Sequence, residues 1–405
     1  MRKIVITGAG LCSPLGWSLA EAREVFAQSR SVISVSPISS PERPRVAAWV
    51  DADISVGLPG SLVKTADRAA VMALQASDRA VADAGLTPGS FDATRAGVFL
   101  GSAIGTIHSV YHAEEALFRR GNMPALTLLK VLPNGAASCV SMRHGFKGEC
   151  TTFAVACASA TTAFGAALRQ LRLGELDVAL VGGAEAPLVE SCVLAWENLR
   201  MIARQDIEHP ETCFRPFAAD RTGVVLGEGA AMYVLETEEH ARARGARILG
   251  VLQGFGASAD AAHITAPQQE GQALAMRKAL QNAGLGPSDI GYINAHGTGT
   301  KLGDATETRS VIDVFGDHAQ RVPMSSTKSA HGHLKGASGA VELAAVLVAL
   351  NDGILPPTLN LNEADPECML DYVPNVARTG VRVDAVMSNA FAFGGSNCSM
   401  VVTRY

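Results

Sequence analysis

A cysteine that follows an apolar run is the strongest candidate for chemistry in this sequence. Cys157 comes after the apolar residues 153–156 and before a small-residue stretch, 158–161, of helical composition, so its thiol is expected at a helix N-terminus. Unpaired N–H groups and the positive end of the helix dipole lower the pKa of a thiol there and favour the thiolate. The same N–H groups could hold a developing oxyanion. A buried structural cysteine is the competing interpretation.

Two histidines in similar surroundings are candidate partners for the thiol. His296 lies in residues 294–300, directly after a predicted strand, where glycines leave room for a ligand and Thr298 and Thr300 offer hydroxyl groups. His333 stands just before a predicted helix, in residues 326–333. Either histidine alone is more often structural than catalytic. A cysteine with two histidines, all at strand or loop ends, favours thiol-based nucleophilic catalysis.

A lysine and a glycine turn could support such a site. Lys328 lies among small residues and needs an acidic partner if it is buried; Asp304, Glu307 and Glu342 could each serve, and a solvated surface lysine is the alternative. Near the C-terminus, two glycines after Phe393 permit a sharp turn whose N–H groups point at a ligand, although an ordinary strand-joining turn fits equally well.

Cofactor and metal sites are weighed and disfavoured. Gly8 and Gly10 follow a predicted strand, residues 4–7, but Ser13 stands where the dinucleotide fingerprint needs its third glycine. A tight strand-to-loop turn is the preferred interpretation. His331 and His333 could bind a metal, yet no further cysteine or carboxylate is grouped with them.

The elements that must position these residues alternate between β-branched runs and Ala-rich helical stretches, a pattern typical of an α/β fold. Residues 79–88 resemble residues 278–287, and each segment reads as a helix end with a glycine stop. Residues 158–176 resemble residues 337–355. These two echoes indicate a duplicated half. Cys157 and His333 would then lie at equivalent ends of two central helices and face one another.

The composition of the chain excludes several classes of protein. The chain has 405 residues, of which 48% are apolar, so it can bury a large core and is not disordered. Its net charge of −5 makes it a poor nucleic-acid binder. No apolar run is long enough to span a membrane, and no secretory signal is recognised. Its eight cysteines form no C-x-x-C pair, so we expect reduced thiols and a cytoplasmic location.

Taken in order, these segments resemble the elongating beta-ketoacyl-acyl-carrier-protein synthases of the thiolase superfamily. The resemblance runs from residues 4–8 to residues 393–397, and includes residues 181–185, 215–221, 226–230 and 260–265. It implies the thiolase fold, a five-layer αβαβα arrangement of two duplicated halves. We place the N-terminal half, with the nucleophile, at residues 1–245 and the C-terminal half, with the two histidines, at residues 246–405.

The resemblance also implies a reaction. Cys157 would accept an acyl group from a carrier-protein thioester, while His296 and His333 would assist decarboxylation of malonyl carrier protein and stabilise the enolate. Attack of that carbanion on the acyl-enzyme is a decarboxylative Claisen condensation, which gives 3-oxoacyl carrier protein. Backbone N–H groups of Cys157 and Phe393 would hold the oxyanion.

Other residues take supporting roles by the same resemblance. Lys328 would act through charge and hydrogen bonds with the acidic group Asp304, Glu307 and Glu342. The hydroxyls of Thr265, Thr298 and Thr300 would contact the phosphopantetheine arm. Ile104 would line the acyl pocket, and Phe391 would bind substrate near Phe393, the gate residue. No cofactor would be required, although Glu342 and Asn389 could hold a structural monovalent cation.

The sequence departs from the family pattern at three places, and these leave the acyl specificity open. Val155 replaces a common threonine, Ala392 replaces a glycine of the gate loop, and residues 126–133 are unusual near the expected dimer contact. A fatty-acid elongator and a polyketide-type synthase therefore both remain possible. The third catalytic residue matches a histidine, which argues against a thiolase-like acyltransferase.

Carrier protein and a second subunit are the expected partners. The family is usually homodimeric, and no nucleic acid or membrane partner is expected. The carrier is acidic, so docking on this net-negative chain needs a local basic patch, for which there are six candidates: Lys64, Arg68, Arg119, Arg120, Arg200 and Arg204. Two other functions compete with the synthase: a non-catalytic partner subunit, which the presence of Cys157 disfavours, and a nicotinamide-dependent oxidoreductase.

Overall fold

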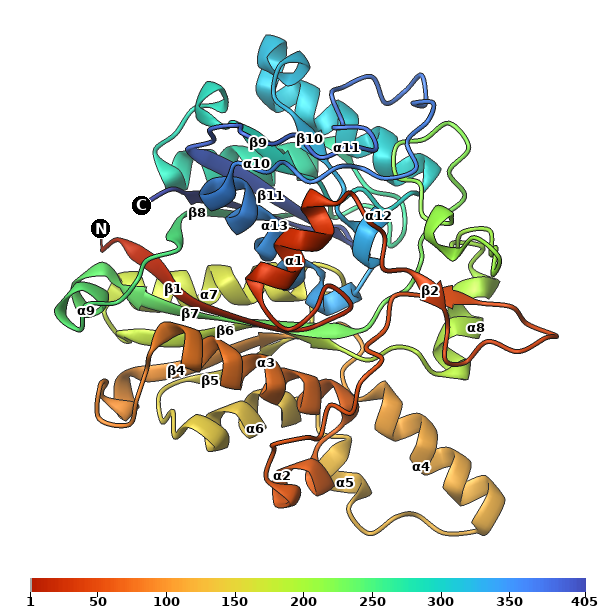
Figure 1. Cartoon of the computed structure of the whole chain (residues 1–405), viewed down its shortest axis with the longest axis vertical. Helices are drawn as coiled ribbons and strands as arrows, with labels where there is room; N and C mark the ends of the chain where they lie inside the picture. Colours follow the sequence, from red (N-terminus) through yellow and green to blue (C-terminus); the bar gives the residue numbers. More distant parts are fainter. Residues whose placement is uncertain (1) are drawn as a thin grey trace.

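Ten strands form the central sheet of the protein in the computed structural model, which describes residues 2–405 (Figure 1). The strand order is β10-β9-β11-β12-β8-β1-β7-β6-β4-β5. The strands of the N-terminal half are β1 (Ile4–Cys12), β4 (Ala96–Gly101), β5 (Cys150–Phe153), β6 (Val178–Glu185) and β7 (Gly229–Thr237). Those of the C-terminal half are β8 (Gly250–Ala259), β9 (Tyr292–Asn294), β10 (Met324–Ser325), β11 (Ala385–Ala392) and β12 (Ser396–Thr403). A small hairpin, β2 (Ser34–Val35) and β3 (Val46–Ala47), lies apart.

The sheet repeats one topology twice. From the centre outward, the order β1-β7-β6-β4-β5 matches β8-β12-β11-β9-β10. In each half the outer three strands are parallel, and the remaining pairings are antiparallel. The halves join where β1 pairs with β8. This repetition is the duplication that the two sequence echoes indicate, and the predicted boundary at residues 245/246 falls between α9 (Glu238–Ala243) and β8.

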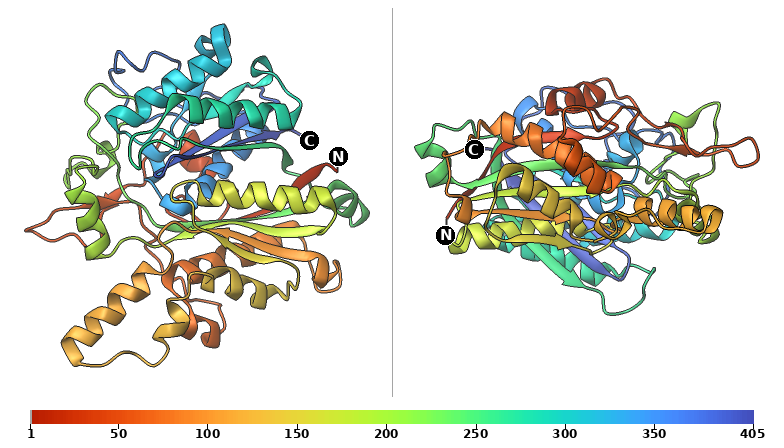
Figure 2. Two further views of the ribbon diagram at one scale, coloured as in Figure 1. Left: turned by 180° about the vertical axis from the view of Figure 1, so that it is seen from behind. Right: turned by 90° about the horizontal axis from the view of Figure 1, so that it is seen from below.

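Helices cover the sheet in layers. The central layer contains α7 (Ser159–Leu173) and α13 (Ser338–Asp352). One outer layer contains α3 (Arg68–Ala84) and α6 (Gly135–His144), and the other contains α10 (Gln269–Ala283) and α11 (Lys301–Phe315) (Figures 1 and 2). The remaining helices are α1 (Leu19–Ala27), α2 (Gly60–Thr65), α4 (Ile107–Arg120), α5 (Thr127–Lys130), α8 (Glu190–Asn198) and α12 (Lys328–His331). The two halves of the sheet lie on opposite sides of α7 and α13 and form the two strand layers. The predicted five-layer αβαβα arrangement is therefore confirmed. Within residues 2–405, no helix combines the length and the apolar character needed to cross a bilayer.

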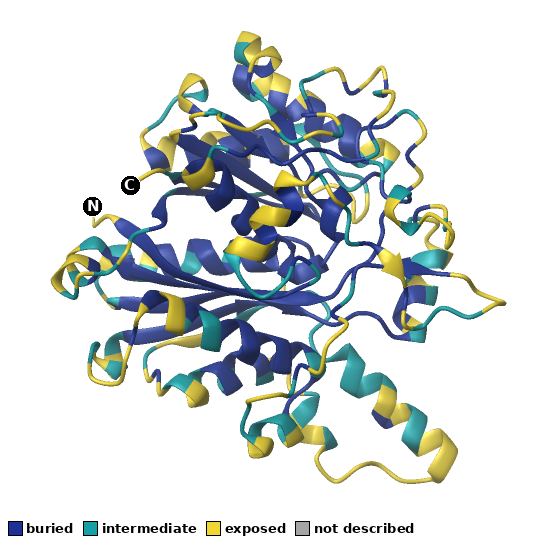
Figure 3. Ribbon diagram, in the orientation of Figure 1, coloured by how far each residue is buried: buried dark blue, intermediate teal, exposed yellow. Residues whose placement is uncertain are grey.

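The core lies on both faces of the strands (Figure 3). In β6, Val178 and Leu180 pack in the cluster under α3 and α6, whereas Ala179 and Val181 pack in the central cluster with α7 and α13. Successive side chains of a strand point to opposite faces, so a strand covered on both sides needs a continuous apolar run. This is why the sheet strands lack the alternating polar residues of a half-exposed sheet.

The glycines in the two echoes end equivalent helices. Gly85 and Gly284 cap α3 and α10 with φ angles of 63° and 71°, and Gly174 and Gly353 cap α7 and α13 with φ angles of 81° and 64°. A left-handed C-cap favours glycine because a Cβ is strained there. The predicted helix stops are confirmed at Gly85 and Gly284, and the structure shows the same cap at Gly174 and Gly353.

The glycines at positions 8 and 10 have a different function from the predicted turn. Both lie inside β1, which continues to Cys12. A Cβ on Gly8 would lie 2.3 Å from the Ala80 carbonyl oxygen, and one on Gly10 would lie 2.2 Å from the Ala76 carbonyl oxygen. The turn interpretation was wrong because the deciding contact is with α3, about 70 residues away in the sequence. These glycines allow α3 to pack directly on the strand.

Candidate active site

The turn between β5 and α7 positions Cys157. Ala156 adopts a left-handed φ of 43°, and α7 begins at Ser159, two residues after the cysteine. The Ser159 hydroxyl accepts a hydrogen bond from the Val155 N–H (2.9 Å) and donates one to the Ala156 carbonyl (2.6 Å), which braces the turn. Within residues 2–405 the N–H of Cys157 donates to no acceptor, and neither does that of Phe393. Both amides are therefore free for a substrate oxygen.

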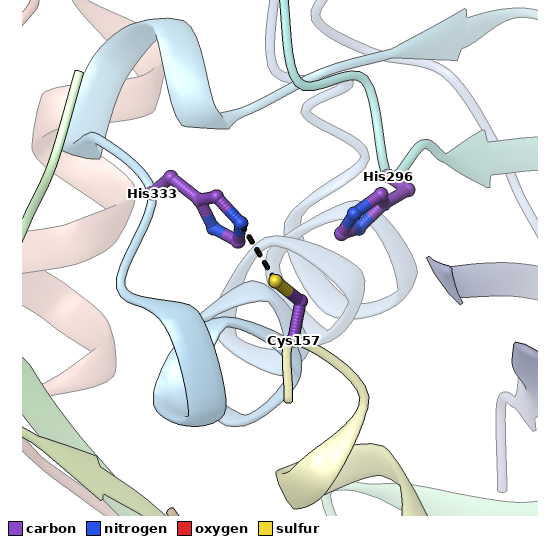
Figure 4. Close-up of side chains that lie close together, drawn as sticks. All are labelled: Cys157, His296 and His333. Carbon is purple, nitrogen blue, oxygen red and sulfur yellow. Dashed lines mark hydrogen bonds between the residues drawn. The ribbon is translucent and has the colours of Figure 1, made fainter. Parts of the chain in front are cut away.

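Three side chains converge at this turn (Figure 4). His333 Nε2 lies 3.1 Å from Cys157 Sγ. The His296 and His333 rings are 5.6 Å apart at an interplanar angle of 84°. The prediction that Cys157 and His333 face one another is confirmed, and they approach from the N-terminal ends of α7 and α13, the two equivalent central helices. Such a constellation can transfer an acyl group to sulfur and move a proton within hydrogen-bond reach.

Neighbouring groups fix the orientation of both imidazoles. Glu307 accepts hydrogen bonds from the backbone N–H groups of His296 (2.9 Å) and Gly297 (2.7 Å), and so holds the turn after β9. His333 Nδ1 lies 2.9 Å from the Ser338 hydroxyl. These contacts leave His333 Nε2 directed at the sulfur.

Burial governs protonation in the site. It lowers the pKa of His296 and of His333 well below 6.5, and the nearby Lys328 and Lys335 cations lower both further. Both imidazoles are therefore neutral at neutral pH. Burial also raises the pKa of the Cys157 thiol above 9.0, against the lowering effect of the same two lysines. The thiol lies next to the helix end as expected, but the expectation of a lowered pKa was wrong, because loss of solvation on burial raises the pKa by more than the two lysines lower it.

The three acidic candidates have three separate positions. Glu342 forms a fully buried ion pair with Lys328, whose Nζ also donates to the His296 carbonyl. Glu307 holds the His296 turn, as described above. Asp304 accepts from the N–H groups of Phe217 (2.7 Å) and Gly299 (3.0 Å). Lys328 is therefore a buried residue that contacts the back of His296, and not a solvated surface lysine.

A cavity of about 270 Å³ opens onto Cys157. The predicted binding residues in its lining are Thr265, Thr298, Thr300, Phe391 and Phe393. Ile104 does not line this cavity; its backbone N–H donates to the buried Glu185. The structure thus brings together all the predicted substrate-binding residues except one.

The gate loop tolerates alanine in place of glycine. Ala392 ends β11, paired with Ser396, and does not adopt a positive φ. The left-handed positions are Gly394 (φ 82°) and Gly395 (φ 70°), which make the turn into β12. The departure at position 392 therefore costs no backbone strain.

Two residues of the site were missed from the sequence. Trp196, on α8, lines the cavity and stacks on Phe393 with ring centroids 5.5 Å apart. Lys335 is buried, and its Nζ lies 3.2 Å from the centroid of the Trp196 ring. A lysine in a run of small residues was the signal that selected Lys328, and it applies equally to Lys335.

Metal ligation would need the catalytic side chains themselves. The donor atoms of Cys157, His296 and His333 lie within 4.8 Å of one another. His331 belongs to another contact, with Thr327 (3.1 Å). The Lys328 ammonium lies 3.5 Å from His296 Nδ1 and opposes a dication at this place. The residues therefore fit acyl chemistry better than a metal centre.

Comparison with known proteins identifies the family. Residues 1–241 match the N-terminal domain of beta-ketoacyl synthases, and residues 249–362 match the C-terminal domain. Nodulation protein E of Rhizobium meliloti is 43% identical over 98% of both chains. The 3-oxoacyl-[acyl-carrier-protein] synthase 2 of Rhizobium meliloti (strain 1021) is 39% identical over 100% of this chain and 99% of that protein. The solved ishigamide ketosynthase/chain length factor superposes with a TM-score of 0.93 at 33% identity, over 100% of this chain and 99% of that chain. This chain belongs to the beta-ketoacyl synthase family, has its thiolase fold, and catalyses a condensation of fatty acid or polyketide elongation.

Proposed function

We propose that Cys157 is the nucleophile of this condensation and that its contact with neutral His333 starts the reaction. The 3.1 Å distance between His333 Nε2 and Cys157 Sγ carries the proposal. As sulfur attacks the carbonyl of an acyl carrier thioester, His333 accepts the thiol proton, and the free N–H groups of Cys157 and Phe393 receive the oxyanion. The tetrahedral intermediate then expels the carrier thiol, which takes the proton from His333. An acyl-Cys157 thioester remains.

Malonyl carrier protein would enter the same cavity for the second half of the reaction. For this step the proton of neutral His333, which is on Nδ1 while Nε2 accepts the thiol proton, moves to Nε2. His296 and His333, each with a proton on Nε2, can then donate hydrogen bonds to the malonyl thioester oxygen. The bond between the α-carbon and the carboxylate breaks, and carbon dioxide leaves. The electron pair of the broken bond forms an enolate that His296 and His333 stabilise. The enolate carbon attacks acyl-Cys157 and expels the sulfur as a thiolate, which takes up one proton from solvent and becomes the thiol again. The other product is 3-oxoacyl carrier protein. The hydroxyls of Thr265, Thr298 and Thr300, which line the cavity, would contact the phosphopantetheine arm of the carrier protein.

Intact-mass analysis tests this function. The protein is incubated with acyl carrier proteins of graded chain length and then with malonyl carrier protein. We expect one acyl mass on the peptide that contains Cys157, followed by a 3-oxoacyl product. A folded protein that gains no acyl mass from any carrier would contradict the proposal and favour a non-catalytic partner subunit.

Neutral histidines predict an unusual pH dependence. Because burial and the lysine cations hold the pKa of His296 and His333 well below 6.5, the imidazoles stay unprotonated as the pH falls through that value. Carbon dioxide release from malonyl carrier protein, measured from about pH 8 to about pH 5, should therefore show no loss centred near 6.5. Lys328→Met removes one of these cations and should move the acidic limb to higher pH. An acidic limb centred at 6.5 in the unmodified enzyme would contradict this prediction.

The acidic carrier would dock at the arginines on the cavity rim. Arg200 and Arg204 are exposed, and Arg200 stands between the lining residues Leu199 and Met201. Arg68 is an unsuitable candidate, since its guanidinium is bonded to the buried Glu228.

We expect Arg200→Glu with Arg204→Glu to raise the apparent KM for acyl carrier protein about tenfold, which corresponds to about 1.4 kcal/mol. The KM for an acyl pantetheine without a protein should stay unchanged, and so should that of a Lys147→Glu control at an exposed site. Equal KM values for the carrier in the charge-reversed and unmodified enzymes would exclude this docking site.

A homodimer is proposed from two exposed features, the apolar side chains on α4 and α5 and the free edge of the sheet. The side chains of Phe118 and Leu128, on α4 and α5, are 85% and 70% exposed, and β5 is an edge strand. Light scattering should give about twice the chain mass of 42.1 kDa. Phe118→Asp with Leu128→Asp should give a folded monomer. A monomer from the unmodified chain would instead favour a heteromeric assembly, the state that the name ketosynthase/chain length factor suggests for the ishigamide protein.

We infer that the chemistry needs no organic cofactor, since the thiol, two imidazoles and two free amides supply every group used above. A monovalent cation at Glu342 and Asn389 is poorly supported, because Asn389 Oδ1 accepts from Ser399 and Glu342 already faces the Lys328 ammonium. All eight cysteines are unpaired, which supports a location in the reducing cytoplasm.

A further inference from the structure

One buried ammonium group near the active site has no partner. Lys335 is 1% exposed, and its Nζ makes no hydrogen bond to any described residue. Its backbone has a left-handed φ of 49°, a conformation that costs free energy for a residue with a Cβ. An unpaired buried charge is more costly still, so this group calls for a physical explanation.

The buried acid that contacts the residue next to Lys335 is already satisfied. Glu185, fully buried at the end of β6, accepts from the N–H of Ile104 (3.2 Å) and from that of Gly336 (3.0 Å), and it also accepts from Ala103 and Ser102. The contact that the structure shows for the Lys335 ammonium is with the Trp196 ring, whose centroid is 3.2 Å away. A cation–π contact compensates part of the lost solvation but supplies no hydrogen-bond acceptor.

Trp196 connects this ammonium to the reacting sulfur. The indole lines the cavity that contains Cys157 and stacks on the gate residue Phe393. Lys335 also follows His333 by two residues, and His333 Nε2 lies 3.1 Å from Cys157 Sγ. An acyl chain on Cys157 that displaces the indole would meet the ammonium.

We propose that Lys335 is a specificity-determining residue whose ammonium donates a hydrogen bond to an oxygen carried on the acyl chain. The pocket then selects acyl chains that bear a carbonyl, hydroxyl or carboxylate oxygen over plain alkyl chains. A site that buries a hydrogen-bonding group rejects the analogue that leaves this group unpaired. This inference rests on the proposed function, because the chain is held as a thioester on Cys157.

Acyl loading from matched carriers tests the inference. Acyl carrier proteins carry chains of one length, either plain alkyl, or with a ketone at successive carbons, or with a terminal carboxylate. The rate of mass gain on Cys157 is measured by quenched intact-mass analysis. We expect the best oxygenated chain to load about tenfold faster than the alkyl chain. Comparison of the ketone chains with one another and with the carboxylate chain identifies which oxygen Lys335 contacts.

The variant Lys335→Met should reduce this ratio to about one, while the exposed-site control Lys147→Met should keep it. The ratio is insensitive to any change in thiol reactivity, since both chains react with the same sulfur. Equal or faster loading of the alkyl chain by the unmodified enzyme would overturn the inference, even if Lys335→Met failed to fold. An unchanged preference in folded Lys335→Met would overturn it too. No loading of any chain would instead overturn the proposed function.

Discussion

Replacement of Cys157 by alanine is expected to abolish acyl loading and to lower the condensation rate by at least roughly 10³-fold. The loss should be this large because no other thiol can take its place: Cys157 is the cysteine that lies 3.1 Å from His333 Nε2 and opens onto the cavity. Intact-mass analysis after incubation with acyl carrier protein, together with steady-state rates of product formation, measures both losses.

Cys398→Ala is the matched control for this variant. Cys398 is also buried and also contacts α7, through the Thr162 hydroxyl at 3.4 Å. It has no histidine partner and does not line the cavity. This variant should load acyl groups at the normal rate. An acyl mass on the Cys157→Ala protein would place the nucleophile elsewhere and contradict the proposed mechanism.

The three residues of the proposed catalytic site were predictable from their local sequence together with the duplication. Cys157 and His296 follow strands among small residues, and the duplication placed His333 opposite Cys157 before any distance was known. The partner of Lys328 was not predictable in the same way. Three carboxylates had suitable positions in the sequence, and only the fold, which brings Lys328 on α12 to Glu342 on α13, selects Glu342.

Two of the features that sequence analysis missed depend on contacts between distant segments. Gly8 and Gly10 look like turn residues until α3 is seen to lie against β1. Nothing in the sequence around Trp196 indicates the site, because its contact with Phe393 joins residues almost 200 positions apart. Lys335 was missed for a different reason. It is a lysine among small residues, and this local signal, which selected Lys328, applies to it as well.

Breaking the buried Lys328–Glu342 pair from either side is expected to lower the free energy of unfolding by about 3–5 kcal/mol. Both side chains are fully buried, so Lys328→Met leaves an unpaired carboxylate and Glu342→Gln leaves an unneutralised ammonium. Urea unfolding followed by circular dichroism measures the change. The exposed pair Arg23–Asp352, 3.0 Å apart, is the control, and Arg23→Met should cost less than about 1 kcal/mol.

The double variant Lys328→Met with Glu342→Leu separates stability from catalysis. Removing both charges removes their desolvation, so the double variant should regain most of the stability that either single change loses. Its condensation rate should stay low, because the Lys328 ammonium also donates to the His296 carbonyl and helps to keep that imidazole neutral. Recovery of the condensation rate together with stability would show that the pair only supports the fold. Recovery of stability alone would assign Lys328 to the positioning of His296.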